Sequence, residues 1–137
     1  MDQKNNGNLL VLNATMILPD KTVLGDLRTE NGTISEIKIG GGLEPNHDEQ
    51  VIDGTGLHLL PGAIDPQVHF REPGQPEKED LGSGSAAAVS GGITSFLDMP
   101  NNKPAITDMK GMQMKLDSAA ATCVNNYGFF IGATPTN

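Results

Sequence analysis

The sequence predicts an α/β protein built in two parts. Residues 1–60 read as short strands joined by turns, whereas residues 61–137 alternate strand, helix, strand, helix and strand. Such alternation is typical of a parallel sheet with helices packed on it, because parallel strands are joined by long crossovers that are usually helical. We therefore expect two structural units, residues 1–60 and residues 61–137.

The first unit is expected to be a small sheet. Leu9–Leu18 is rich in Leu, Val and Ile, and it stops at Pro19. Asn31-Gly32 is a hairpin signal, because both residue types accept the positive φ of a tight hairpin turn. Apolar and polar side chains alternate in the segment after this turn, as in a half-buried strand. The expected strands are 9–18, 22–28, 33–39, 51–53 and 57–60.

The second unit opens with a strand and continues with a helix over Leu81–Ser90. The acidic residues that end with Asp80 precede this helix, and the partial positive charge of a helix N-terminus favours them. Gly91 suits the helix end. Ile93–Asp98 is a compact apolar segment of strand length that stops before Pro100.

A second helix is predicted from apolar residues that recur at helical spacing. They are Met109, Met112, Leu116, Ala119, Ala120 and Cys123. This stripe predicts a buried helix face, so Cys123 is assigned to the core rather than to a metal or redox site. The apolar segment Tyr127–Ala133 follows as a third strand of this unit.

Charge and composition exclude several classes of partner and location. The chain has 9 Lys+Arg against 17 Asp+Glu, a net charge of -8, which disfavours binding to nucleic acid or to an anionic membrane. The single cysteine cannot form an internal disulfide and suits a reducing compartment. No charged-then-apolar leader and no run of roughly 18 apolar residues is visible. We expect a cytoplasmic protein.

The strand that opens the second unit separates its side chains by chemistry. Side chains alternate across a strand, so Ile64, Pro66, Val68 and Phe70 are expected on one face and Asp65, Gln67, His69 and Arg71 on the other. The polar face thus carries an acid, an imidazole and a fixed cation instead of the Thr, Ser and Lys of an ordinary wet face. This pattern indicates a reaction site.

The predicted topology brings a second polar residue to the same place. In parallel α/β sheets, chemistry collects at the carboxyl ends of the strands. Gln67, His69 and Arg71 lie at that end of the first strand, and Asn101 lies just past the end of the next one. We therefore expect these side chains to share one rim of the sheet.

Two motifs in this region resemble those of the dihydroorotase family of the amidohydrolase superfamily. They are His-Phe-Arg-Glu-Pro-Gly at residues 69–74 and Asp-Met-Pro-Asn at residues 98–101. The resemblance extends over residues 9–137. It implies a barrel of eight strands and eight helices with a small β-sandwich. Residues 1–60 would form the N-terminal part of that sandwich, and residues 61–137 the first three strand–helix units of an incomplete (β/α)8 TIM-like barrel.

The resemblance also implies an activity. Members of the family catalyse the zinc-dependent, reversible cyclisation of N-carbamoyl-L-aspartate to L-dihydroorotate in de novo pyrimidine biosynthesis. The implied cofactor is zinc, and the implied partner is this small-molecule substrate, with a homo-oligomer possible for the full-length protein. More than half of the family's usual chain is absent here, so we expect residues 1–137 alone to be inactive.

The family pattern assigns roles to four positions. His69 corresponds to a zinc-binding histidine, Arg71 to the arginine that grips the substrate carboxylate, and Asn101 to an asparagine that hydrogen-bonds the substrate. Gln67 stands where the family has its first zinc-binding histidine. An amide carbonyl is a far poorer zinc ligand than imidazole, so this metal position is weakened. The catalytic aspartate and the other zinc ligands would follow Asn137, which leaves no catalytic residue within this chain.

Each of these residues also has a structural interpretation. His69 could be a satisfied structural histidine, Asn101 a turn residue after Pro100, and Arg71 the partner of a nearby glutamate (Glu72, Glu77 or Glu79). Asp65 would fix a loop or the tautomer of the histidine, or would contact the metal. Asp98 would either face the barrel interior or form a structural pair.

Two alternative functions stay open. The first is a non-catalytic dihydroorotase-like structural or assembly subunit, for which Gln67 is the sequence evidence. The second is a cyclic amidohydrolase of the hydantoinase or allantoinase type. Arg71 and the Asp-Met-Pro-Asn motif disfavour the second alternative, because they suit a ring that carries a carboxylate.

Overall fold

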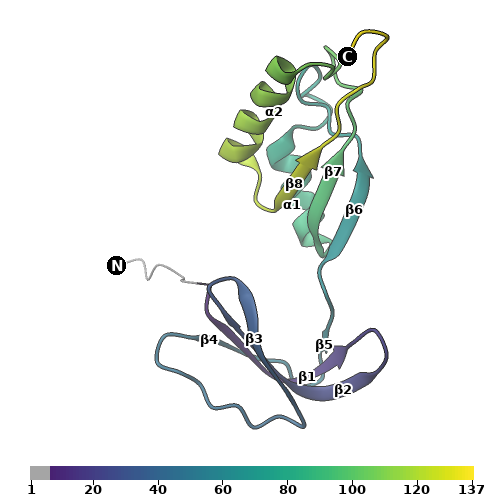
Figure 1. Ribbon diagram of the computed structural model, residues 1–137. Coiled ribbons are helices and arrows are strands. Elements are labelled where there is room, and N and C mark those ends of the chain that lie inside the picture. The colour runs from purple at the N-terminus through teal and green to yellow at the C-terminus, as the bar shows by residue number, and fades with distance from the viewer. Residues whose placement is uncertain (1–6) are drawn as a thin grey trace. The chain divides into compact units, whose positions relative to one another are not determined.

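The computed structural model describes residues 7–137, and the chain divides into two compact units (Figure 1). Unit 1 is Met1–Pro61 and unit 2 is Gly62–Asn137. No helix among the described residues is long and apolar enough to cross a membrane.

Unit 1 is a five-stranded sheet centred on its first strand. Its strands are β1 (Leu9–Ile17), β2 (Thr22–Glu30), β3 (Thr33–Ile39), β4 (Gln50–Asp53) and β5 (His58–Leu59). The order is β3-β2-β1-β4, and β5 pairs with β1. The β1–β2 and β2–β3 pairs are antiparallel, whereas β4 and β5 run parallel to β1. Each of the five segments expected from the sequence is a strand.

A buried carboxylate supports the irregular part of unit 1. The β1–β2 register shifts between Val11 and Ala14, where Asn13 has a φ of 57°. Asp26 is 1% exposed, and its carboxylate accepts hydrogen bonds from the backbone N–H groups of Asn13 (2.8 Å) and Leu43 (2.9 Å). It thus satisfies two donors that have left the regular ladder.

Burial by itself raises the pKa of the Asp26 carboxyl. The backbone N–H groups of Asn13 and Leu43, together with the nearby Lys38 ammonium, outweigh that effect and lower the pKa below its ordinary value. The folded state therefore favours the ionised carboxylate.

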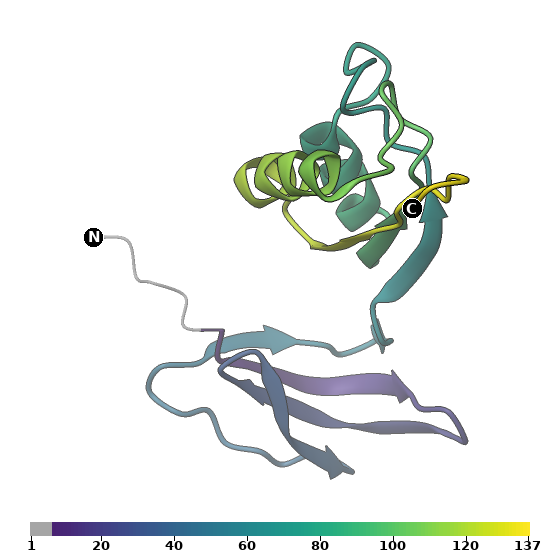
Figure 2. The ribbon, with the colours of Figure 1, turned by 45° about the horizontal axis from the view of Figure 1, so that its top comes forward.

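Unit 2 alternates strands and helices as expected. Its elements are β6 (Ala63–Val68), α1 (Leu81–Ser90), β7 (Ile93–Asp98), α2 (Met109–Thr122) and β8 (Asn126–Phe129). The strands form a parallel sheet in the order β6-β7-β8. Both helices lie on the same side of that sheet (Figures 1 and 2). Asp80 and Asp108 cap the two helices by accepting hydrogen bonds from Ser83 and Gly111.

The core of unit 2 lies between the sheet and the helices. It consists of Phe70, Leu81, Phe96 and Ala119. The Phe70 and Phe96 rings meet edge to face, with centroids 4.8 Å apart. Gly84 of α1 faces Phe70, and a Cβ at Gly84 would lie only 2.6 Å from the ring. The glycine therefore lets the helix approach the residue that directly follows His69.

The sequence prediction was wrong at three places in unit 2. Strand β6 ends at Val68, and Ile64 is 66% exposed, because β6 pairs only with β7 among the described residues. Strand β8 ends at Phe129 and does not continue to Ala133. Met109 of the expected apolar stripe is 72% exposed.

The buried residues of α2 are Lys115 and Ala119. A lysine thus occupies the helix face that the stripe assigned to methionine and leucine, because a buried carboxylate faces it from β7.

We expect Asp26→Ala to lower the free energy of unfolding by about 2–4 kcal/mol, because two buried N–H groups lose a charged acceptor. Urea titration followed by circular dichroism measures the difference. Asp20→Ala, at an exposed turn, is the matched control and should change stability by no more than about 0.5 kcal/mol. Equal midpoints for the two variants would contradict this role of Asp26.

The difference in the free energy of unfolding between wild type and Asp26→Ala should depend on pH. The folded-state pKa of Asp26 lies below its ordinary value of 3.8, so its stabilisation is fully present above that value. As pH falls through the lowered pKa, the carboxylate is protonated and the difference between wild type and Asp26→Ala should shrink.

Candidate active site

Two residues expected to share the rim of the sheet are in direct contact. His69 directly follows β6, and Asn101 follows β7 by three residues. The His69 Nδ1 atom lies 3.0 Å from Asn101 Oδ1, and both side chains are exposed. A carboxamide oxygen only accepts hydrogen bonds, so Nδ1 carries the proton. The lone pair of the ring is therefore on Nε2, which is left available to a ligand.

Arg71 lies two residues beyond His69, and its backbone is held on both sides. Its N–H donates to the carbonyl of Glu79 (3.0 Å), and its carbonyl accepts from the N–H of Gln75 (2.9 Å). Within residues 7–137, no ion pair involves the Arg71 guanidinium. The alternative in which Arg71 pairs with a neighbouring glutamate is thus not the arrangement seen, and the half-buried side chain keeps its donors for another partner.

A buried polar network lies directly beneath this segment. Asp98 Oδ1 accepts from the N–H of Phe70 (3.0 Å), and Asp98 Oδ2 lies 2.6 Å from Lys115 Nζ. Lys115 Nζ also donates to Asn102 Oδ1 (2.7 Å). The Asn102 amide in turn donates to the carbonyls of Phe70 (3.1 Å) and Glu72 (3.0 Å). These contacts tie the ends of β6 and β7 to α2.

The charges of this network are almost completely excluded from water. The side chains of Lys115 and Asp98 are 1% and 0% exposed. Burial raises the pKa of the Asp98 carboxyl, and the Lys115 ammonium and the Phe70 N–H oppose that rise. Lys115 Nζ also lies 4.9 Å from the centre of the Phe129 ring, a favourable position for a cation. Of the two interpretations of Asp98, the structure shows the structural pair.

Glu72 fixes the loop that carries Arg71 to both helices. Its carboxylate accepts hydrogen bonds from the N–H of Leu81 (3.0 Å) and from the hydroxyl of Ser118. The first contact places a negative charge at the N-terminus of α1, where the helix dipole favours it. Glu72 is therefore committed to the helices and is not a partner for Arg71.

Gln67 and Asp65 do not join the His69–Asn101 pair. The Gln67 side chain is exposed, and its backbone N–H donates to Asp65 Oδ1 (3.0 Å). Asp65 thus fixes the local backbone, which is one of the roles expected for it. The β6–β7 register shifts between Asp65 and Val68, which ends the regular alternation before His69.

The described residues do not complete a zinc site. Catalytic zinc is usually held by three protein ligands. Residues 7–137 contain no group of three or more His, Cys, Asp or Glu side chains placed to hold a metal ion. His69 fits as one ligand through Nε2, and the remaining ligands would have to come from outside these residues.

The other two histidines belong to unit 1, and the cysteine belongs to unit 2. His47 is exposed and contacts Asp48 (2.8 Å), and His58 belongs to β5. Cys123 packs against the core of unit 2, as expected from its place in the apolar stripe. These contacts give none of the three residues a role in the site.

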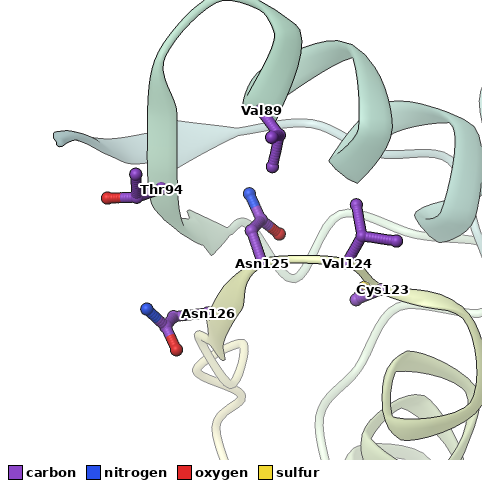
Figure 3. A pocket seen from close by; sticks show the side chains of 6 residues that line it. All are labelled: Val89, Thr94, Cys123, Val124, Asn125 and Asn126. Atoms are coloured by element: carbon purple, nitrogen blue, oxygen red, sulfur yellow. The ribbon is translucent and has the colours of Figure 1, made fainter. Parts of the chain in front are cut away.

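An open depression with a volume of about 510 Å³ lies near the amino-terminal ends of β7 and β8, whereas the candidate site lies at the carboxyl ends of the strands (Figure 3). It is lined by Val89, Thr94, Cys123, Val124, Asn125 and Asn126. Thr94 and Asn126 are at the amino-terminal ends of β7 and β8, whereas Asn101 follows the carboxyl end of β7. The depression is therefore separate from the candidate site.

Sequence reasoning missed Lys115 and Asn102, although a signal for Lys115 was present. Asp98 ends an apolar strand, and a carboxylate in that place needs a partner. Lys115 lies three residues after Met112 and four before Ala119, on the face of the predicted stripe. Asn102 had no signal that separated it from an ordinary turn residue.

This chain is similar in sequence to an amidohydrolase family model and to bacterial dihydroorotases. Residues 58–137 match the model described as "Amidohydrolase family". The dihydroorotase of Streptococcus pyogenes serotype M3 is 44% identical over 91 residues, which cover 66% of this chain and 21% of that protein. The dihydroorotase of Trichlorobacter lovleyi is 42% identical over 117 residues, which cover 84% of this chain and 27% of that protein.

Solved structures of similar fold include two hydantoinases. The L-hydantoinase (dihydropyrimidinase) from Arthrobacter aurescens has a TM-score of 0.81 at 23% identity, over 94% of this chain and 28% of that one. The D-hydantoinase (dihydropyrimidinase) from a Thermus species has a TM-score of 0.75 at 30% identity, over 91% and 27%. This chain thus spans between 21% and 28% of the length of these four relatives.

The contact with Asn101 predicts the tautomer of His69. In the unprotonated ring we expect the proton on Nδ1, and Asn101→Ala should shift the population toward the Nε2–H form because the acceptor is lost. The ¹⁵N chemical shifts of the ring report the tautomer. His58, which is exposed in unit 1, is the internal control and should not change. An Nε2–H tautomer at His69 in the unmodified protein would contradict the contact.

Proposed function

Because this chain belongs to the amidohydrolase family, we propose that it is the N-terminal part of a dihydroorotase. Its reaction would be the reversible cyclisation of N-carbamoyl-L-aspartate to L-dihydroorotate in pyrimidine biosynthesis. The observation that carries the proposal is the contact between His69 and Asn101 at the carboxyl ends of β6 and β7, with Arg71 two residues after His69 in the chain.

Arg71 is proposed to bind the carboxylate of the substrate. Its planar guanidinium can donate two parallel hydrogen bonds to one carboxylate, which a lysine cannot do. The free guanidinium and the fixed backbone support this role, because the side chain starts from a defined point and has no acidic partner among the described residues. Orientation of a bound substrate is a large part of the rate acceleration by enzymes.

Asn101 is proposed to bind the substrate through its amide nitrogen. Its oxygen accepts from His69, so the two amide hydrogens are left to donate to a ring carbonyl or carboxylate. The same contact would orient the imidazole of His69. Asn101 would then bind the substrate through its amide nitrogen and orient the metal ligand His69 through its oxygen.

Zinc is the proposed cofactor, with His69 as a ligand through Nε2 and the other ligands supplied from outside this chain. At metal sites, a histidine ligand usually donates the N–H of its second ring nitrogen to a neighbouring oxygen. The His69–Asn101 contact supports that arrangement. Gln67 would be a weak ligand at most, because its carbonyl is neutral.

For the architecture, we propose that unit 2 is the first part of a (β/α)8 barrel and unit 1 part of a β-sandwich. Parallel pairing in chain order, with both helices on one side, supports the barrel. Exposed apolar side chains on β2 and β3 support a second layer over unit 1; among them are Leu24, Ile34 and Ile39, each 57% exposed. A cytoplasmic location and a possible homo-oligomer complete the proposal.

A hydantoinase-type cyclic amidohydrolase is the second candidate, because the D-hydantoinase of known structure shares this fold at 30% identity. The two candidates differ in the ring they take. A dihydroorotase requires the ring carboxylate, for which Arg71 is suited, whereas hydantoin carries no carboxylate.

The direct test is to assay the full-length protein that carries this sequence with L-dihydroorotate and with hydantoin. Preferential turnover of dihydroorotate supports the proposal, and preferential turnover of hydantoin supports the second candidate. We expect residues 1–137 alone to be inactive, because residues 7–137 contain no complete metal site.

Arg71 variants test the grip on the carboxylate. Arg71→Lys keeps the charge but loses the paired geometry, and Arg71→Met loses both. A charge-assisted interaction of this kind contributes about 1.5–3 kcal/mol, so kcat/KM should fall by about one to two orders of magnitude. Metal content, measured by elemental analysis, should not change. Unaltered kinetics in both variants would remove Arg71 from the site.

The amide at Gln67 predicts low metal content. We expect the full-length protein to hold about one zinc ion per chain or less, and Gln67→His to raise both occupancy and activity. His69→Ala should lower the zinc that is bound. Two tightly held ions in the unmodified protein would contradict the inference from ligand chemistry. No zinc in either protein would favour the non-catalytic subunit.

A further inference from the structure

The backbone on both sides of Arg71 is hydrogen-bonded by the buried side chains of Asp98 and Asn102, which do not contact the Arg71 guanidinium. We propose that Lys115, acting through Asp98 and Asn102, is a positioning residue that selects substrates bearing a carboxylate. The inference rests on the proposed function of Arg71. It assigns a role to the buried network, which the proposed chemistry does not use.

Three hydrogen bonds of the network converge on the two residues that flank Arg71. The Phe70 N–H donates to Asp98, and the Phe70 carbonyl accepts from Asn102. The Glu72 carbonyl accepts from the same Asn102 amide. Since both neighbours of Arg71 are fixed in this way, the position of its backbone is fixed as well.

Lys115 determines which way the Asn102 amide points. Its ammonium donates to the Asn102 oxygen at 2.7 Å, which leaves the nitrogen of the amide facing the carbonyls of Phe70 and Glu72. The same ammonium neutralises Asp98 at 2.6 Å. One buried cation thus holds both side chains that contact the Arg71 segment, and without it the amide is free to reverse.

The network also reaches the other half of the site. Asn101 directly precedes Asn102, which is 6% exposed and bonded to three partners. His69 directly precedes Phe70, whose N–H and carbonyl are both engaged. Lys115 contacts neither member of the His69–Asn101 pair, which is held by its own direct hydrogen bond, so the contacts that this pair makes with a ring should survive the loss of Lys115.

A displaced Arg71 backbone should harm one class of ligand more than another. Paired hydrogen bonds to a carboxylate depend on distance and angle, and a displacement of about 1 Å can cost roughly a hundredfold in rate. A ring without the carboxylate makes no such pair. Loss of Lys115 should therefore reduce selectivity, whereas a general loss of stability would weaken both kinds of ligand equally.

The test uses the full-length protein with Lys115→Met, and with Lys110→Met on the exposed side of α2 as the matched control. Binding of L-dihydroorotate and of dihydrouracil, the same ring without the carboxylate, is measured by calorimetry. For Lys115→Met we expect affinity for dihydroorotate to fall about 10- to 100-fold and affinity for dihydrouracil to change less than about twofold. Equal losses for both ligands, or no loss, would overturn the inference.

A second variant decides the matter if Lys115→Met does not fold. Asn102→Asp has nearly the same shape and can still accept from Lys115, but it cannot donate to the carbonyls of Phe70 and Glu72. The same selective loss of dihydroorotate binding is expected. Unchanged selectivity in this variant would also overturn the inference.

Hydrogen exchange separates this inference from the proposed function. Amide exchange over residues 69–74 should accelerate at least about tenfold in Lys115→Met and in Asn102→Asp, and should match wild type in Lys110→Met. A wild-type protein that binds no dihydroorotate would refute the proposed function. Unchanged exchange in a protein that does bind it would refute only the positioning role.

Discussion

The buried ion pair between Asp98 and Lys115 is the contact on which the geometry of unit 2 depends most. Removing two such charges from water costs several kcal/mol per ion, and apolar side chains of the same volume are often as stable or more so. Here each ion has further partners, since Asp98 accepts from Phe70 and Lys115 donates to Asn102. The pair therefore joins α2 to the ends of two strands, which apolar packing would hold with less directional precision.

Unit 1 also contains a buried aspartate, Asp26, that accepts hydrogen bonds from backbone N–H groups outside the regular strand pairing. Asp26 accepts from Asn13 in the irregular stretch of β1 and from Leu43 in the loop before β4. In both units a single buried aspartate satisfies backbone donors at the point where the chain leaves a regular strand. Asp26 is ionised by its hydrogen bonds, whereas burial pushes Asp98 toward the neutral form and a lysine opposes it.

Local signals in the sequence predicted most elements of the fold, and long-range pairing explains where they failed. Asp80 and Gly91 mark the ends of α1 because capping depends on adjacent residues. The meeting of His69 with Asn101 followed from parallel topology alone. The burial of Lys115 could not be predicted from its helix alone, because the signal for it combines its place on the apolar face with an unpartnered carboxylate on β7. The end of β6 at Val68 depends on its register with β7, which periodicity within one strand does not contain.

The order β6-β7-β8 has a consequence for how the protein is made. Within residues 7–137, each strand of this sheet pairs only with its nearest neighbours along the chain, and α2 precedes β8. All the side chains that hold the Arg71 segment lie between β6 and the end of α2. Because synthesis proceeds from the N-terminus and contacts between nearby segments close early, this substructure can assemble on the ribosome before β8 emerges, and β8 is then added to a sheet whose geometry around Arg71 is already established.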